Sequence, residues 1–261
     1  MSGNNAVPGR SVTSKTVTIL DAFAGNRTEL SLSDITRATD LPSSTVHRLV
    51  QELVSWGGLE RTPRGHYAVG LRLWEIGARS DTSYSLRDAA MPYLRELFDV
   101  TRQHVQLAVM DGNDALLIEK LTAPAAISTF GRPGGRLPLH ASAIGKALLA
   151  AANADHSERV LAAPLPQYTD YTITDTRDLR TELANVRREG FAVSRQELSI
   201  GVDSCAVAIA GVSGSRLAAI SVVLPSTRGT LREIAHTVAD TARAISSAVN
   251  IDRPRLAMSL G

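Results

Sequence analysis

Cysteine is almost absent from this chain of 261 residues, which contains one, Cys205. A single cysteine excludes an intramolecular disulfide bond and any metal site built from paired cysteines, and it fits a reducing compartment. Long apolar runs are also missing: no stretch of about 18 apolar residues is present, so we expect no membrane-spanning segment. Residues 1–10 are polar and lack the apolar core of a signal peptide, so we expect a disordered tail there. These absences favour a cytoplasmic protein.

A large excess of charge is missing as well. Lysine and arginine number 28 and aspartate and glutamate number 26, so the formal net charge is +2. A charge this small does not mark the whole chain as a nucleic-acid binder, so any such surface must be local. A phosphate-binding glycine motif such as Gly-x-x-x-x-Gly-Lys-Ser is also lacking. Hydrophobic residues make up 44% of the chain, enough for the core of one large domain or two modest ones.

The strongest helical periodicity lies in residues 43–54, where apolar side chains recur at i, i+3, i+4, i+7 and i+8. Arg48 on the opposite face is the best candidate for base readout, because its guanidinium group matches the two acceptors of guanine. Ser44 and Thr45 lie in the first turn, where short donors and the helix dipole suit phosphates. Taken alone, the pattern is more typical of an ordinary solvated helix face. The candidate DNA-binding residues of this helix are Ser44, Thr45, His47, Arg48 and Gln51.

The neighbouring segments change that balance. Another helix is expected from Ser31, whose hydroxyl can cap it, and Leu41 is expected to fill the corner before the next helix. After Trp56-Gly57-Gly58, residues 59–62 and 66–69 flank a turn and predict a short hairpin. Its basic residues Arg61, Arg64 and His66 are placed to reach phosphates or a minor groove. The order predicts a winged helix-turn-helix over residues 11–70, with a simple packing hairpin as the alternative.

The second part of the chain mixes strand and helix patterns. Residues 71–85 are expected to hold a linker helix and a domain boundary, residues 86–252 a second domain, and residues 253–261 a C-terminal tail. Hairpin strands separated by helices predict an α+β fold with an antiparallel sheet and flanking helices. The expected strands are 104–110, 115–121, 126–130, 204–210 and 218–224, and the expected helices include 86–102, 141–149 and a long final one from Leu231 to Val249.

Several blocks of the chain resemble the IclR family of bacterial transcription regulators. They include Leu-Pro-Ser-Ser-Thr-Val-His-Arg-Leu49 and Leu-Pro-Leu-His-Ala-Ser-Ala-Ile-Gly-Lys-Ala-Leu-Leu149, with further matches at 11–23, 65–73, 186–193 and 219–225. Several blocks in the right order are more specific than any one motif. The resemblance implies a winged helix joined by a linker helix to an effector-binding domain similar to GAF-type sensors. It also implies a dimer or dimer of dimers on a near-palindromic operator.

The resemblance further implies where a small effector binds. Backbone N–H groups at a helix start, with nearby hydroxyls, suit a carboxylate. Ala143-Ile144 stands where some relatives have a small glycine, and Val223 stands where some have a second serine, so the pocket is more apolar here. We therefore expect an effector larger or less polar than a two-carbon acid. The residues implied are Ser142, Ala143, Ile144, Ser204 and Ser221.

Alternatives stay open beside this interpretation. An enzyme would use His140, Cys205 and Asp203 as a thiol-type constellation, but nothing in their spacing requires proximity. Cys205 follows Ser204 on an expected strand, so its side chain should face the core. Ser204 and Ser221 can also be simple strand hydroxyls paired with backbone. A sensor whose winged helix contacts protein is the third reading. We expect a ligand-responsive DNA-binding regulator with no catalytic residue, no metal and no cofactor.

Overall fold

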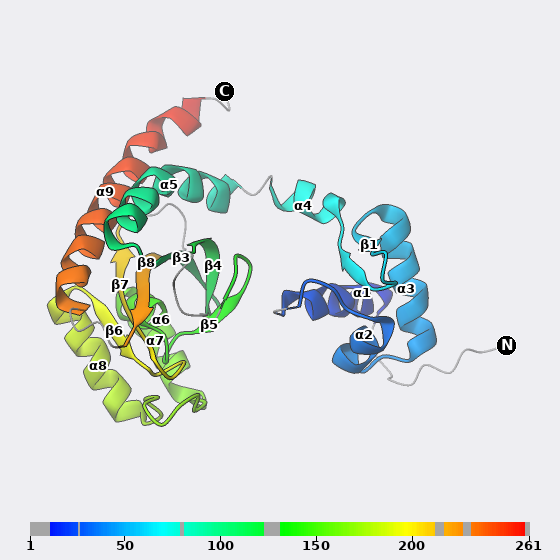
Figure 1. The fold of residues 1–261 in the computed structure, drawn as a ribbon, viewed down its shortest axis with the longest axis horizontal. Coiled ribbons are helices and arrows are strands. Elements are labelled where there is room, and N and C mark those ends of the chain that lie inside the picture. The colour runs from blue at the N-terminus through cyan, green and yellow to red at the C-terminus, as the bar shows by residue number, and fades with distance from the viewer. Residues whose placement is uncertain are drawn as a thin grey trace. The chain divides into compact units, whose positions relative to one another are not determined.

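The structure, a computed structural model, describes residues 11–25, 27–78, 81–122, 131–211, 217–226 and 231–258. It divides into a first unit, Met1–Asp81, and a second unit, Thr82–Gly261 (Figure 1). The tail expected at 1–10 and the strand expected at 126–130 lie outside the described residues. Within the described ranges, every helix is too short or too polar to cross a membrane.

The first unit contains a helix-turn-helix followed by a hairpin, which confirms the predicted fold class. Hydrogen bonds cap both ends of α2, at Ser31 before it and at Asp40 in the turn that follows it. Ser31 Oγ accepts from Asp34 N at 3.1 Å and Asp34 Oδ2 accepts from Ser31 N at 3.1 Å, a reciprocal cap. Asp40 takes the left-handed conformation, with φ of 52°. The elements are α1 (Val12–Asp21), η1 (Ala22–Ala24), α2 (Leu32–Thr39), α3 (Ser43–Trp56), β1 (Leu59–Arg61), β2 (Tyr67–Val69) and α4 (Leu71–Gly77).

The core of the first unit forms on the apolar side of α3, as the periodicity predicts. Val46, Leu49, Val50 and Leu53 are buried, and Leu41 fills the corner before α3. Strands β1 and β2 pair antiparallel, and Tyr67 also exchanges two backbone hydrogen bonds with Leu30, at 2.9 and 2.8 Å. The hairpin is therefore fastened to the segment before α2. The outer face of α3 is left uncovered within this unit.

The described part of the second unit forms a six-stranded antiparallel sheet in the order β5-β4-β3-β8-β7-β6. Helices α5 and α9 pack on one face, and α6, α7 and α8 pack on the other (Figure 1). This is the predicted α+β arrangement. The strands are β3 (His104–Asp111), β4 (Asp114–Leu121), β5 (Arg136–Pro138), β6 (Ala192–Arg195), β7 (Val202–Ile209) and β8 (Ala218–Pro225); the helices are α5 (Asp81–Thr101), α6 (Ala143–Ala151), α7 (Ala154–Ala162), α8 (Thr176–Glu189) and α9 (Leu231–Met258).

Neighbouring strand residues contribute to different cores. Cys205 lies in the core beneath α5 and α9, whereas Ala206 lies in the core beneath α6, α7 and α8. Ile220 and Ala219 divide in the same way, because successive side chains of a strand point to opposite faces. Cys205 therefore faces the core, as predicted.

Two helix ends differ from the sequence expectation. Helix α5 begins at Asp81, before the expected start at residue 86. Helix α9 continues to Met258, so residues 253–258 of the expected tail are helical as well. Both expected helix ends were placed where the sequence becomes polar. A helix satisfies its own backbone hydrogen bonds, so a polar sequence can continue one when an adjoining turn is anchored by apolar contacts.

The start of α6 packs very closely against the end of β5. A Cβ atom added at Gly145 would lie 2.5 Å from Leu139 Cα and 2.6 Å from Pro138 O. Both are backbone atoms, which cannot move aside as a side chain end can. Position 145 therefore accepts glycine alone unless α6 shifts away from the sheet.

We expect Gly145→Ala to destabilise the second unit by about 1–3 kcal/mol, because overpacking outweighs the better helix propensity of alanine. Gly77→Ala is the control: it is also helical, but nothing lies within 4 Å of the added Cβ. Urea unfolding followed by circular dichroism measures both. A stability of Gly145→Ala equal to that of the wild type would contradict the close-packing argument.

Candidate nucleic-acid interface and ligand cavity

The outer face of α3 carries the predicted polar residues. Ser44, His47, Arg48 and Gln51 are exposed and Thr45 is half-buried. Arg48 Nη1 lies 2.6 Å from Glu52 Oε1, one helical turn away, and both side chains are more than half exposed. An exposed pair of this kind contributes only about 0.3–0.5 kcal/mol. Arg48 can therefore exchange Glu52 for a nucleic-acid partner at little cost.

The beginning of α3 presents backbone donors. Pro42 occupies the capping position and provides no side-chain hydrogen bond, while its carbonyl accepts from Thr45 N at 2.9 Å and Val46 N at 3.0 Å. The N–H groups of the preceding positions, Ser43 and Ser44, have no partner within an α-helix. They lie at the positive end of the helix dipole, which favours a phosphate.

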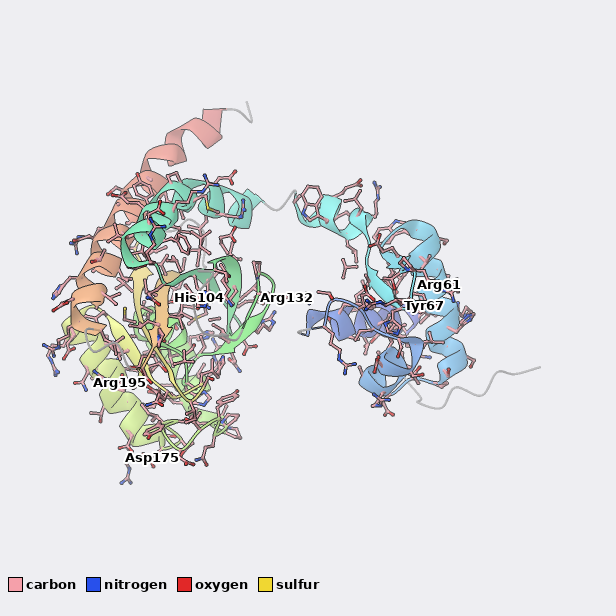
Figure 2. The ribbon with its side chains drawn as sticks, viewed as in Figure 1. Arg61, Tyr67, His104, Arg132, Asp175 and Arg195 are labelled. Atoms are coloured by element: carbon pink, nitrogen blue, oxygen red, sulfur yellow. The ribbon has the colours of Figure 1, made fainter. Side chains whose placement is uncertain are left out.

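The three basic residues of the hairpin differ in their exposure to solvent. Arg61 and Arg64 are exposed to solvent (Arg61 is labelled in Figure 2). His66 is half-buried, with Nδ1 3.7 Å from Glu29 Oε2. Gln51 Nε2 donates to the Tyr67 hydroxyl at 3.3 Å, so Gln51 also braces the hairpin against α3. The structure thus groups the α3 and hairpin candidates in one unit, and Arg48, Arg61 and Arg64 are the exposed arginines among these candidates.

A cavity of about 460 Å³, including its open mouth, lies between the start of α6, the segment after β6 and three strands of the sheet. The structure brings all five implied residues, 142–144, 204 and 221, to its wall. Every side chain in the described part of that wall is uncharged. Among the described residues, the lining consists of Gln106, Leu137, Ser142, Ala143, Ile144, Ser194, Leu198, Ser199, Val202, Ser204, Ser221 and Val223.

Ser142 caps α6. Its hydroxyl proton is already used in a hydrogen bond, so Ser142 cannot also donate to a ligand. Its Oγ accepts from Gly145 N at 3.1 Å and donates to Pro138 O at 2.7 Å. The cap leaves the N–H groups of Ala143 and Ile144, the first two of the helix, without intrahelical partners. The helix start therefore offers these two backbone donors to the cavity, and Ser142 supports them.

The two strand serines behave differently. Ser221 is buried, and its Oγ donates to Gln106 Oε1 at 3.1 Å instead of pairing with backbone. The Ser204 hydroxyl makes no hydrogen bond to any described residue, so the backbone-paired alternative does not describe it either. Ser204 is therefore the serine whose hydroxyl is available at the cavity wall.

Gln106 is a cavity residue that sequence reasoning missed. It is buried in the middle of β3, and its Oε1 accepts from Ser221. The other end of the amide, Nε2, carries two N–H donors. A signal was present in the sequence, because Gln106 is a neutral polar residue inside the apolar run 105–110. Buried polar side chains need a partner.

The structure does not form the alternative thiol site. Cys205 is fully buried in the core beneath α5 and α9, and burial raises the pKa of its thiol to about 12. His140 precedes α6 on the opposite face of the sheet, with Nε2 2.9 Å from Pro166 O, and burial lowers the pKa of its imidazole. A thiolate and a nearby base are both missing from this pair.

We expect Cys205 to resist thiol reagents in the folded protein. At pH 8 a thiol with a pKa of about 12 has a thiolate fraction on the order of 10⁻⁴. Labelling with a maleimide, followed by mass spectrometry, should give no adduct until denaturant is added and one adduct afterwards. Thr181→Cys, which places a second thiol on the exposed side of α8, is the positive control. Rapid labelling of folded wild-type protein would contradict the burial argument.

Comparison with known proteins places both units in one family. The family model described as "IclR helix-turn-helix domain" matches residues 12–63, and "Bacterial transcriptional regulator IclR C-terminal" matches residues 79–247. The chain is 32% identical over 251 residues to the HTH-type transcriptional repressor AllR of Escherichia coli (strain K12), covering 94% of this chain and 93% of AllR. It is 33% identical over 233 residues to the HTH-type transcriptional regulator BhcR of Paracoccus denitrificans, covering 87% and 83%.

A solved structure agrees with these relatives. The crystal structure of an IclR homolog complexed with 4-hydroxybenzoate, from Microbacterium hydrocarbonoxydans, superposes with a TM-score of 0.85 at 36% sequence identity. It covers 92% of this chain and the whole of the other. The similarity therefore extends through both units.

Proposed function

Because the chain belongs to the IclR family of bacterial transcriptional regulators, we propose that it binds a near-palindromic DNA operator under the control of a small-molecule effector. The DNA-binding part of the proposal rests on the exposed face of α3, where Arg48 forms a weak ion pair beside a basic hairpin. The effector half is carried by the cavity at the start of α6. A regulator of this kind works beside the chromosome, in the cytoplasm.

In this proposal α3 enters the major groove. Arg48 leaves Glu52 and donates to the two acceptors of a guanine, and His47 faces the neighbouring base edges. Ser44 and Thr45 at the helix start bind a phosphate, and Arg61, Arg64 and His66 of the hairpin reach the backbone or the minor groove. The division follows from position, because side chains in the middle of α3 reach bases whereas its N-terminus and the hairpin flank the groove.

Two winged helices are needed to read two half-sites, so the proposal includes self-association as a dimer or a dimer of dimers. An exposed apolar surface on α4 supports it. Leu71, Trp74 and Ile76 are each more than half exposed in the described chain. A short helix with three large apolar side chains in water gains stability when a second copy covers it.

We propose that the effector is an organic acid with an apolar body. Its carboxylate would accept from the N–H groups of Ala143 and Ile144 and from the Ser204 hydroxyl, at the positive end of α6. Leu137, Leu198 and Val223 give the remaining wall an apolar character. The ligand named for the Microbacterium hydrocarbonoxydans structure, 4-hydroxybenzoate, is an acid of this class.

Selection of bound sequences from random or genomic DNA tests the DNA proposal. We expect Arg48→Ala to lose about 1–3 kcal/mol on the selected operator and to relax preference at one base position. Arg177→Ala, which removes an exposed arginine from α8 in the second unit, is the matched control and should leave the selected sequence unchanged. Absence of salt-dependent DNA binding by the intact wild-type protein would reject the proposal and favour a sensor whose winged helix contacts protein.

Isothermal titration with a panel of aliphatic and aromatic acids tests the effector class. We expect 4-hydroxybenzoate or a similar aromatic acid to bind more tightly than two-carbon acids, because it buries more apolar surface. The neutral 4-hydroxybenzamide is the matched control for the carboxylate, and its loss relative to the acid should be about 1.5–3 kcal/mol, as for hydrogen bonds to a charged group. Exclusive binding of the smallest and most polar acids would count against an apolar cavity.

A further inference from the structure

Lys146 is a completely buried cation on α6, within one turn of Ala143 and Ile144, which line the cavity. Its Nζ lies 2.8 Å from Glu197 Oε1 and 3.1 Å from Glu182 Oε1. A buried ammonium is very unfavourable without such compensation. Lys146, Glu182 and Glu197 are absent from the described lining of the cavity. The Lys146 ammonium therefore pairs with carboxylates of the protein and is not a ligand contact.

Glu197 receives less compensation than Lys146. Its carboxylate is buried, and Oε2 makes no hydrogen bond to any described residue. Burial raises the pKa of Glu197, and the adjacent Lys146 ammonium opposes that rise. Glu182 differs, because its side chain is partly exposed on α8 and water can solvate it. Of the two carboxylates, Glu197 depends on Lys146 and is held in place by it.

The position of Glu197 matters because of the segment that contains it. Residues 196–201 connect β6 to β7, and Leu198 and Ser199 of this segment line the cavity. The connection is tight: Gln196 has φ of 59° and its Oε1 accepts from Gly201 N at 2.9 Å. We call residues 196–201 the β6–β7 connection. Its side toward the cavity is one wall, and the start of α6 is another.

Threonine hydroxyls in the segment before α8 also donate to the backbone of the same connection. Thr172 Oγ1 donates to Glu197 O at 2.6 Å, and Thr169 Oγ1 donates to Gln196 O at 2.7 Å. These hydrogen bonds hold the connection to residues 169–172, which are not part of α6. The ion pair with Lys146 is the side-chain contact between Glu197 and α6.

We propose that Glu197, held by Lys146, is a positioning residue that sets the width of the cavity between α6 and the β6–β7 connection, and thereby its affinity for the effector. The inference rests on the proposed effector function of the cavity. Glu197 acts through Leu198 and Ser199, which line the cavity, and Lys146 acts through the helix that presents Ala143 and Ile144.

The test compares Glu197→Gln with Glu182→Gln in the full chain. Each removes one carboxylate from Lys146, but only position 197 belongs to the β6–β7 connection. Hydrogen–deuterium exchange without ligand should show faster exchange in peptides spanning 196–201 for Glu197→Gln and wild-type exchange there for Glu182→Gln. Titration with 4-hydroxybenzoate should show affinity weakened about tenfold by Glu197→Gln and less than about twofold by Glu182→Gln.

A double variant separates positioning from stability. Lys146→Met combined with Glu197→Gln removes the cation that the single variant would leave buried without Glu197, so folding is protected. Its β6–β7 connection should still exchange fast and its affinity should stay low. Restored protection in the double variant, or equal effects of Glu197→Gln and Glu182→Gln, would overturn the proposal. If wild-type protein does not bind 4-hydroxybenzoate, the titration uses the tightest-binding acid of the panel. If no acid binds, the effector class is wrong, and exchange at 196–201 still tests whether Glu197 positions the connection.

Discussion

The close packing of α6 on the end of β5 is the constraint on which the ligand cavity depends. Gly145 lets the helix approach the Pro138–Leu139 backbone, and at that distance Ser142 can cap the helix and donate to Pro138 O at once. The first N–H groups of α6 then open into the cavity. The same approach buries Lys146 one turn later, where it needs a carboxylate from the β6–β7 connection.

The sequence predicts local structure in the first unit well because the signals there are local. The cap at Ser31 and the apolar spacing of α3 act within one or two turns, and Leu41 and the hairpin follow directly. The same holds for strand alternation, which places Cys205 in a core. The ends of α5 and α9 were missed, because polar composition says little about where a packed helix stops.

The chemistry of the cavity is less accessible from the sequence because its contacts join distant residues. Resemblance to the family identifies five wall residues, but it does not show that the Ser142 hydroxyl is occupied by capping or that Ser221 binds Gln106, 115 positions away. The pair of Lys146 and Glu197 spans 51 positions. Only the folded sheet brings these atoms together. The sequence therefore cannot show which donors are already hydrogen-bonded within the protein and which can bind a ligand.

On the proposed function, the DNA-binding face and the cavity, whose described wall is uncharged, should respond differently to ionic strength. Contacts between exposed arginines and phosphates release counterions and weaken steeply as salt rises. A carboxylate held by backbone N–H groups and a hydroxyl at a helix start, partly shielded from water, is screened much less. On the proposed function, a rise in cellular salt would weaken the affinity for DNA and leave the affinity for the effector nearly unchanged. The protein would then combine an osmotic input with a metabolic one.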